Sequence, residues 1–299
     1  MPEAVGPVAL QNPALVYGLL FEAASATLRQ IAADPKHLGA QIGVLAVLHT
    51  WGQTLVHHPH LHCVCTGGGL ACDRDGRAVE SADWVACRPG FFLPVRVLSR
   101  LFRGKFLAGL QKAYRAGQLE WHGRLAALAE AAAFRSWLQP LYSQKWVVYA
   151  KAPFAGPETV LKYLARYTHR VALSNRRLLQ VADGRVTFSY HDYRHGARAR
   201  ELTLGADEFL RRFLQHVLPR GFVKIRHYGL LRSRGRDERL ARCRAQLAWL
   251  GLAAAVTAAA PAVGAACPLC GGALAVLAEL PRPGCPVASR PSCAGADTS

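Results

Sequence analysis

The sequence has few acidic residues and no export signal. Only 19 Asp and Glu stand against 37 Lys and Arg among 299 residues, which gives a formal net charge of +18. The N-terminus, MPEAVGPVALQNP, has no basic start followed by an apolar run, so we expect no signal peptide. Nine cysteines without such a signal indicate reduced thiols in a cytoplasmic protein. The positive charge favours nucleic acid as a partner, and a basic surface that only keeps the protein soluble is the alternative.

Long apolar runs are also scarce. Residues 247–266 carry no charge and are long enough to span a bilayer, but they are mostly Ala and Gly with an internal Pro. This composition favours a linker, and we expect no membrane span. Because 51% of the residues are hydrophobic and 19% are charged, the chain is typical of a globular protein. The composition shifts towards Ala, Gly, Pro and Cys near residue 245, which predicts a main domain at 1–245 and a tail at 246–299.

The spacing of apolar residues predicts both helices and strands. Asp183-Gly184 between two alternating segments is a strong signal for a β-hairpin. Helices are expected at 13–32, twice within 95–139, at 157–170 and at 206–218; strands are expected at 42–56, 60–66, 146–150, within 171–193 and at 221–229.

Two histidines in the segment HPHLHCVCT form the first candidate site. In an extended strand, alternation places His60 and His62 on one face and Leu61 and Cys63 on the other. Two imidazoles two residues apart can chelate one cation. The pattern is short, so ordinary core or surface histidines remain an alternative. A metal-dependent hydrolase is another, although Cys63-Val64 stand where metallo-β-lactamase-like hydrolases have Asp-His.

Two tyrosines in ETVLKYLARYTHR (158–170) form the second candidate site. On a helix, Tyr163 and Tyr167 lie side by side at a boundary between an apolar arc and a basic arc. This arrangement suits chemistry on a phosphodiester, because the basic arc can hold phosphates beside the phenols. Tyrosines that pack with their hydroxyls at the surface are the alternative. The cations of the basic arc that we select as DNA contacts are Lys162, Arg166 and Arg170.

Five longer blocks of sequence resemble the two-tyrosine HUH transposases, the enzymes of rolling-circle insertion sequences. They follow the order of that family across residues 10–245. The blocks are HTWGQTLVHHPHLHCVCTGGGL (49–70), WVVYAKAPFAGP (146–157), YLARYTHRVALSNRRLL (163–179), VTFSYHDYR (186–194) and GFVKIRHYGLL (221–231).

The resemblance implies a fold, an activity and a site. The fold is an α+β, HUH endonuclease-like (ferredoxin/RRM-like) antiparallel sheet with packed helices, on which the histidine strand is central. The activity is nicking and rejoining of single-stranded DNA, at transposon ends and target, through a 5′-phosphotyrosine. Tyr163 and Tyr167 are the implied nucleophiles, and His60 and His62 the implied ligands of Mg²⁺ or Mn²⁺. The motif does not fix a third ligand; we select Gln53, for which an ordinary buried amide is the alternative.

One departure from the family bears on activity. Members usually begin with a cysteine-rich zinc-binding segment and a first strand, and the sequence opens instead almost directly on ALQNPALVYGLLFEAA. We therefore expect an N-terminally shortened copy, with a mispredicted start as the alternative; the loss of a strand would weaken the sheet that supports the metal site. Two functional alternatives stay open. One is a degenerate, non-catalytic DNA-binding fragment, and the other is an unrelated metal-dependent hydrolase.

Two further features concern binding. Cys267 and Cys270 have the spacing of a zinc-knuckle half, but Cys285 and Cys293 are a poor partner half, so free thiols are the alternative. The basic segment 224–244 is expected to contact the DNA backbone, with a solvated charged face as the alternative. Such a protein would be associated with the bacterial nucleoid, and self-association stays open. The DNA contacts selected from this segment are Lys224, Arg226 and Arg232.

Overall fold

A computed structural model describes residues 1–73, 83–90, 92–151, 159–160 and 172–249. Its central element is a long hairpin of two antiparallel strands, β1 (Ala40–Trp51) and β2 (His57–Ala71). Strand β3 (Trp84–Ala86) pairs with β2, and β7 (Ile225–Gly229) pairs with β1. The four-stranded antiparallel sheet therefore has the order β3-β2-β1-β7, with the histidine strand in its interior.

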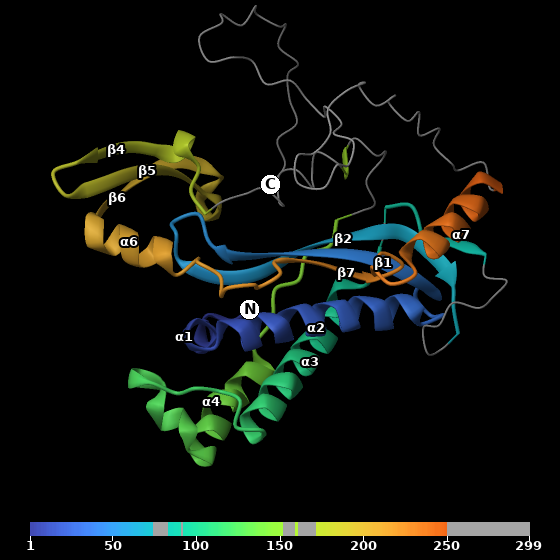
Figure 1. Cartoon of the computed structure of the whole chain (residues 1–299), viewed down its shortest axis with the longest axis horizontal. Helices are drawn as coiled ribbons and strands as arrows, with labels where there is room; N and C mark the ends of the chain where they lie inside the picture. Colours follow the sequence, from blue (N-terminus) through green and yellow to red (C-terminus); the bar gives the residue numbers. More distant parts are fainter. Residues whose placement is uncertain (74–82, 91, 152–158, 161–171, 250–299) are drawn as a thin grey trace, which may run out of the picture. The chain divides into compact units, whose positions relative to one another are not determined.

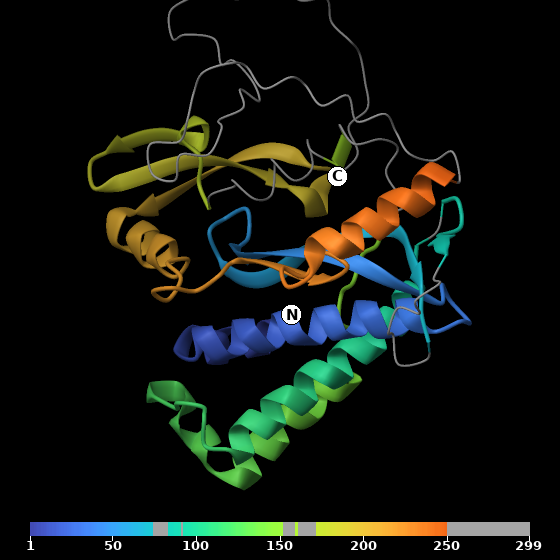
Figure 2. The same cartoon turned by 45° about the vertical axis from the view of Figure 1, so that its right-hand side comes forward.

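Helices cover one face of this sheet (Figures 1 and 2). Helix α2 (Pro13–Ala33) runs along the sheet, and α3 (Val95–Arg115) packs against α2 on its far side. The short helix α1 (Gly6–Gln11) precedes α2, and α4 (Ala131–Ser143) packs against α3. Apolar residues of α2, among them Val16 and Leu20, share one core with Ala46 and Leu48 of β1.

A second, three-stranded antiparallel sheet follows in the chain. Its strands β4 (Leu178–Ala182), β5 (Arg185–Asp192) and β6 (Arg198–Gly205) lie in sequence order. Helix α6 (Ala206–Leu214) follows β6 and packs against the sheet through Phe209, which contacts Phe188. Asp183 and Gly184 both have positive φ, 52° and 67°, as the tight turn between β4 and β5 requires.

The remaining described elements are one helix and four short turns. Helix α7 (Arg236–Trp249) follows β7. No helix in the described residues is both long enough and apolar enough to cross a membrane. Residues Met1–Leu247 form one compact unit, separate from Ala248–Ser299. The assignment of residues 1–245 to catalysis stays a prediction. The 3₁₀ turns are η1 (Glu3–Val5), η2 (Gly123–Ala129), η3 (Asn175–Arg177) and η4 (Tyr193–His195).

The predicted α+β class with an antiparallel sheet is confirmed, and one predicted strand is wrong. Residues 146–150 form no regular element. The indole Nε1 of the buried Trp146 donates to the carbonyl of Leu141, while Val147 and Tyr149 are 84% and 77% exposed. The alternation of apolar residues here reflects anchoring by Trp146 and not pairing in a sheet.

Several boundaries also differ from expectation. Helix α6 ends at Leu214, before the predicted end at 218, and β7 begins only at Ile225. Strand β6 was not predicted, because its sequence RARELTLG is mostly polar and exposed. The helix predicted at 157–170 lies outside the described residues, apart from Thr159 and Val160, which are helical.

Candidate metal centre on the β1–β2 hairpin

Three histidines meet on the face of the sheet opposite α2. His49 of β1 stands directly across from His60 of β2, and His62 stands across from Val47. Leu61 and Cys63 point to the other face, where they pack against the helical core. The alternation predicted from the sequence is therefore confirmed, and it brings both predicted histidines to one surface.

The donor atoms of the three rings are close enough to share one ion. One ring nitrogen of each of His49, His60 and His62 lies within 4.8 Å of the others. The Nε2 atoms of His60 and His62 are 3.1 Å apart. Two nitrogens bound at right angles, each about 2.1 Å from one cation, would be about 3.0 Å apart. The spacing thus fits two ligands of a single metal ion.

The backbone of β2 fixes the proton on His60. The Nδ1–H of this ring donates to the carbonyl of His58 at 2.7 Å. In the neutral ring, the lone pair is then on Nε2, the atom that faces His62. In many proteins, a metal-binding histidine is oriented by such a hydrogen bond from the ring nitrogen that does not bind the metal.

Burial keeps His60 neutral. Desolvation lowers the pKa of His60 to about 4, so the ring is unprotonated at neutral pH. Only neutral imidazole binds a metal. His49 is 3% exposed, and its ring stacks on Trp51 at 4.6 Å between centroids. The third histidine is therefore held in place by packing.

His49 was not selected from the sequence. Its place beside His60 depends on the register of the hairpin, which the spacing of residues along the chain does not reveal. Gln53, the ligand selected instead, lies in the turn between β1 and β2, where its backbone carbonyl accepts a hydrogen bond from Arg177. A role for its side chain as a ligand stays a prediction.

Other titratable groups occupy the helix side of the hairpin tip. The hydroxyl of Tyr17 is hydrogen-bonded to Nε2 of His57 at 2.8 Å, and burial raises the pKa of Tyr17 to about 12. Desolvation lowers the pKa of His57 to about 4. His216 lies parallel to His57 at 6.5 Å, accepts from the Thr50 hydroxyl through Nδ1 and donates from Nε2 to Leu55. These bonds tie α2 and the segment after α6 to the tip.

The predicted DNA contacts in the C-terminal part of this unit differ in their surroundings. Arg226 of β7 lies on the α2 side, with its guanidinium 4.4 Å from the ring centre of Phe21 and 5.1 Å from that of Phe222. Packing therefore accounts for its position there. Lys224 directly precedes β7, and Arg232 is exposed before α7. Their contacts with DNA stay predictions.

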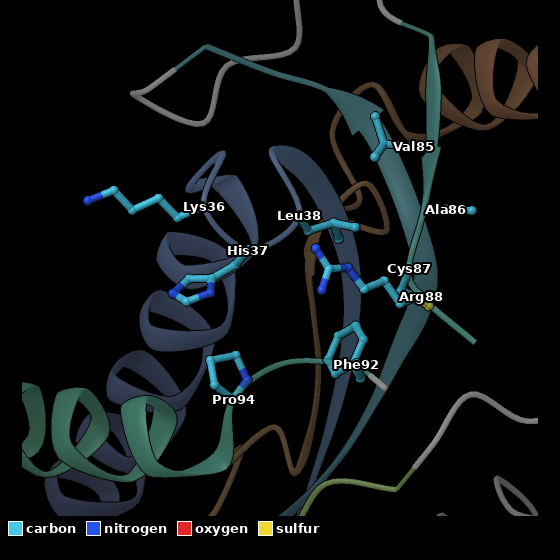
Figure 3. A pocket seen from close by; sticks show the side chains of 9 residues that line it. All are labelled: Lys36, His37, Leu38, Val85, Ala86, Cys87, Arg88, Phe92 and Pro94. Carbon is cyan, nitrogen blue, oxygen red and sulfur yellow. The ribbon is translucent and has the colours of Figure 1, made fainter. Parts of the chain in front are cut away.

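A basic hollow lies at the end of β1 remote from the cluster of His49, His60 and His62 (Figure 3). It measures about 330 Å³ and lies between the α2–β1 connection, β3 and the start of α3. Arg88 extends into the hollow towards Leu38, whereas Lys36 extends away from it. None of the nine lining residues carries a carboxylate, and three are Lys36, His37 and Arg88. The hollow adds to the positive surface of the unit.

Comparison with known proteins identifies the family. A family model named Y2_Tnp and described as "Putative transposase" matches residues 43–239, a stretch that contains the histidine hairpin and the second sheet. The chain belongs to this transposase family. The resemblance drawn from the sequence blocks is thereby confirmed.

Two curated relatives of this transposase-family chain agree. It is 59% identical over 244 residues to "Putative transposase y4qJ" of Sinorhizobium fredii, covering 82% of the chain and 60% of that relative. It is 28% identical over 236 residues to "Transposase for insertion sequence element IS801" of Pseudomonas savastanoi pv. phaseolicola, covering 78% and 53%. The chain thus spans between half and three fifths of the length of these relatives. No solved structure matches it.

Several predicted site residues of the transposase lie outside the described residues. The implied nucleophiles are among them, and so are the basic neighbours on the same segment and the cysteines of the zinc-knuckle half. These residues are Tyr163, Tyr167, Lys162, Arg166, Arg170, Cys267 and Cys270. Their roles stay predictions.

Proposed function

We propose that this transposase-family chain nicks and rejoins single-stranded DNA through a covalent link to Tyr163 or Tyr167. The observation that carries the proposal is the cluster of His49, His60 and His62 on the central hairpin of an antiparallel sheet. A cluster of three imidazoles has the chemistry of a cation site. The family membership adds the expectation of DNA strand transfer.

The chemistry follows from the weakness of a phenol as a nucleophile. Tyrosine has a pKa of about 10, so little phenolate exists at neutral pH. A divalent cation held by the three histidines would polarise the scissile phosphate and offset its developing negative charge. His60 would contribute its Nε2 lone pair, which the bond from Nδ1 to His58 keeps available.

The proposed cleavage is a transesterification. The Oη of the tyrosine forms a bond to phosphorus and the bond to the 3′ oxygen breaks, which leaves a 5′-phosphotyrosine and a free 3′-hydroxyl. The phenol releases one proton to solvent, and the departing oxygen takes one up. Rejoining is the reverse attack by a 3′-hydroxyl, and it needs no ATP because the phosphotyrosine conserves the ester bond. A second tyrosine would allow two DNA ends to be held in turn.

The donor set also bears on the choice of metal. Imidazole nitrogens favour transition metals, whereas Mg²⁺ prefers oxygen ligands. We therefore propose Mn²⁺ before Mg²⁺ as the working ion. The partner would be single-stranded DNA from transposon ends and target, and the place of action the bacterial nucleoid. The net charge of +18 supports a polyanionic partner.

A strand-cleavage assay with end-labelled DNA tests the proposal. Single strands that cover both flanks of the protein's own gene are incubated with the full chain and Mn²⁺. A 5′-phosphotyrosine requires that a 3′ label migrates with the protein on a denaturing gel, while a 5′ label appears on a shorter, protein-free strand. Chelation of the metal should abolish both products.

Tyrosine variants separate the alternatives. The double variant Tyr163→Phe with Tyr167→Phe should form no adduct, whereas Tyr193→Phe, at an exposed tyrosine of η4, should behave as wild type. Cleavage that survives in the double variant would favour a metal-dependent hydrolase. DNA binding by the wild type without cleavage would favour the non-catalytic fragment. Either result would overturn the proposal.

A further inference from the structure

One arginine joins three separate parts of the chain. Arg177, at the end of η3, donates from Nε to the carbonyl of Ser189 at 2.8 Å. Its Nη1 donates to the carbonyl of Ala172 at 3.3 Å, and its Nη2 donates to the carbonyl of Gln53 at 2.5 Å. The guanidinium also lies 5.8 Å from the ring centre of Phe188. A planar group with five donors suits such a three-way contact.

Two of the three acceptors belong to segments that carry residues of the proposed reaction, and the third lies in a supporting strand. Gln53 lies in the turn of the β1–β2 hairpin, between His49 and His60. Ala172 stands five residues after Tyr167 in the chain. The third acceptor lies in β5 of the second sheet. Arg177 therefore connects the histidine hairpin to the end of the tyrosine-bearing segment, with β5 as the support.

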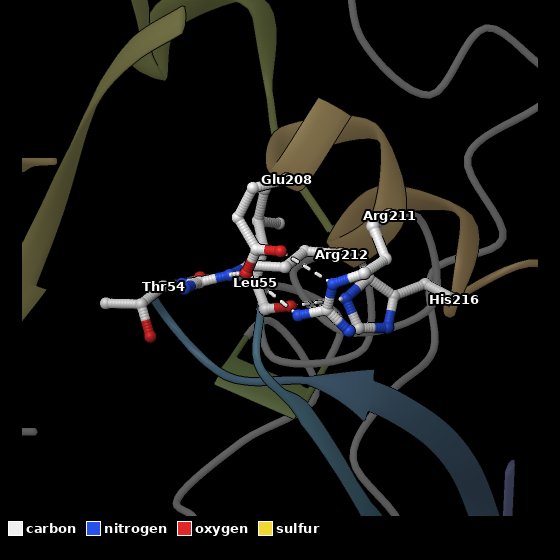
Figure 4. A network of polar contacts seen from close by, with 6 residues as sticks. All are labelled: Thr54, Leu55, Glu208, Arg211, Arg212 and His216. Carbon is white, nitrogen blue, oxygen red and sulfur yellow. Dashed lines mark hydrogen bonds and ion pairs between the residues drawn. The ribbon is translucent and has the colours of Figure 1, made fainter. Parts of the chain in front are cut away.

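Neighbouring contacts hold the same turn from α6 and the segment after it (Figure 4). Arg212 of α6 donates to the carbonyl of Thr54 at 3.2 Å, and His216 donates to that of Leu55 at 3.1 Å. Glu208 holds Arg212 at 2.6 Å and also binds Arg211. Three consecutive carbonyls of the turn thus accept bonds from side chains that follow the tyrosine segment.

Packing and backbone conformation indicate that the turn is held firmly. Leu55 is fully buried and packs with Ala172 and Phe188. Its φ of 59° lies in the left-handed region, which costs a non-glycine residue about 1–2 kcal/mol. Such a conformation persists only where the surroundings impose it.

We infer that Arg177 is a positioning residue, which holds Ala172, the described residue that follows the tyrosine-bearing segment, against the turn of the histidine hairpin. This inference rests on the proposed function. In-line attack requires the nucleophile close to the phosphate, and a displacement of about 1 Å can slow a reaction about 100-fold. Arg177 bonds the backbone carbonyls of Gln53 and Ala172, so its loss should slow the reaction without removing a metal ligand.

The adjacent arginine provides a matched control. Arg176 is exposed, carries the same charge and lies in the same 3₁₀ turn. The variants are Arg177→Lys, Arg177→Ala and Arg176→Ala, each made in the full chain. The measurements are the single-turnover rate of adduct formation, the Kd for Mn²⁺, the Kd for the single-stranded oligonucleotide and Tm.

We expect Arg177→Ala and Arg177→Lys to slow adduct formation about 100-fold, because neither side chain can bond three carbonyls in one plane. Both Kd values should stay within about twofold of wild type, since the substitution removes none of the three histidines. Arg176→Ala should react at the wild-type rate. Added methylguanidinium should restore part of the rate to Arg177→Ala but not to Arg177→Lys, in which the ammonium occupies the site.

Two results would overturn the inference alone: an Arg177→Lys variant with the wild-type rate, or a loss of Mn²⁺ binding that parallels the loss of rate. The second would mean that Arg177 only maintains the folded hairpin. If Arg177→Ala fails to fold, Arg177→Lys carries the same comparison. A wild-type chain that forms no adduct with any strand would overturn the proposed function, and this inference with it.

Discussion

His60 takes its orientation from the backbone of its own strand. The bond from Nδ1 to the carbonyl of His58 places the lone pair on Nε2, and burial lowers the pKa of the ring to about 4. His49 is fixed differently, by stacking on Trp51. Each of these two rings is thus oriented by a local interaction. The loss of either ring should therefore weaken metal binding without unfolding the hairpin.

Metal binding should depend on all three rings. Replacement of His49, His60 or His62 by Ala should raise the Kd for Mn²⁺ by at least about tenfold. Even the loss of a group that only hydrogen-bonds a metal ligand weakens metal binding about tenfold or more. Titration calorimetry on the DNA-free protein measures this directly. His37→Ala, at an exposed position by the remote basic hollow, is the control. Equal affinity in the His60→Ala variant would exclude this cluster as the metal site.

Acid should destabilise the protein through His57. Its pKa is about 4 in the folded protein, below the ordinary value of about 6.5. Between pH 6.5 and 4 the unfolded chain binds a proton that the folded chain does not. The free energy of unfolding should therefore fall as the pH is lowered through this window. His57→Gln should flatten the dependence of Tm on pH there, whereas exposed His37→Gln should not; identical curves for His57→Gln and wild type would contradict this account.

At the scale of elements, the four-stranded sheet depends on close approach between β7 and β1. Gly229 ends β7 with a φ of 60°, and a Cβ added there would stand 1.9 Å from the carbonyl oxygen of Ile42. Gly18 in α2 has open space around the same position. A side chain is therefore excluded at Gly229 but can be accommodated at Gly18, although both glycines lie in regular elements.

This contrast gives a stability prediction. Gly229→Ala should lower the free energy of unfolding by about 3 kcal/mol or more, through the clash and the left-handed backbone. Gly18→Ala should raise it by up to about 1 kcal/mol, because alanine favours the helix. Urea denaturation measures both. A Gly229→Ala variant as stable as wild type would mean that β7 does not pair with β1 in this register.

The elements also show what a sequence can predict. Helix α2 was predicted because its apolar residues follow the helical period over many positions, β1 because of its apolar run, and part of β2 because of the segment HLHCVCT. The Asp183-Gly184 turn was predicted because both residues tolerate positive φ. Strand β6 was missed because half of its residues are polar and most of them are exposed, which leaves no clear apolar alternation. His49 was missed because register decides which residues face each other across a hairpin.

At the scale of the whole molecule, positive charge is the dominant feature. The formal net charge is +18, and eight of the 37 Lys and Arg lie in the basic segment 224–244. A chain of this kind gains affinity for DNA chiefly by releasing counterions, so binding should weaken steeply with salt. The dependence of DNA affinity on salt concentration, measured in variants, identifies the cations that contact phosphates.

Arg232 and Arg234, both exposed before α7, should contribute to this affinity. Their joint replacement by Gln should reduce the slope of log K against log salt by about 1.4, since each phosphate contact on a single strand contributes about 0.7. Fluorescence anisotropy with labelled oligonucleotides measures the slope. The control replaces exposed Arg124 and Arg135, of η2 and α4, with the same change of charge. Equal slopes in the two double variants would remove the basic segment from the DNA-binding surface.

Mass spectrometry of the DNA-linked protein tests the central claim most directly. Trypsin cleaves after Lys162, Arg166 and Arg170, so it separates Tyr163 and Tyr167 into the peptides YLAR and YTHR. After reaction with single-stranded DNA and Mn²⁺ and digestion of the DNA, one or both of these peptides should carry a 5′-linked nucleotide on the phenol. Cleaved DNA with both peptides unmodified, or a nucleotide attached elsewhere in the chain, would contradict the account.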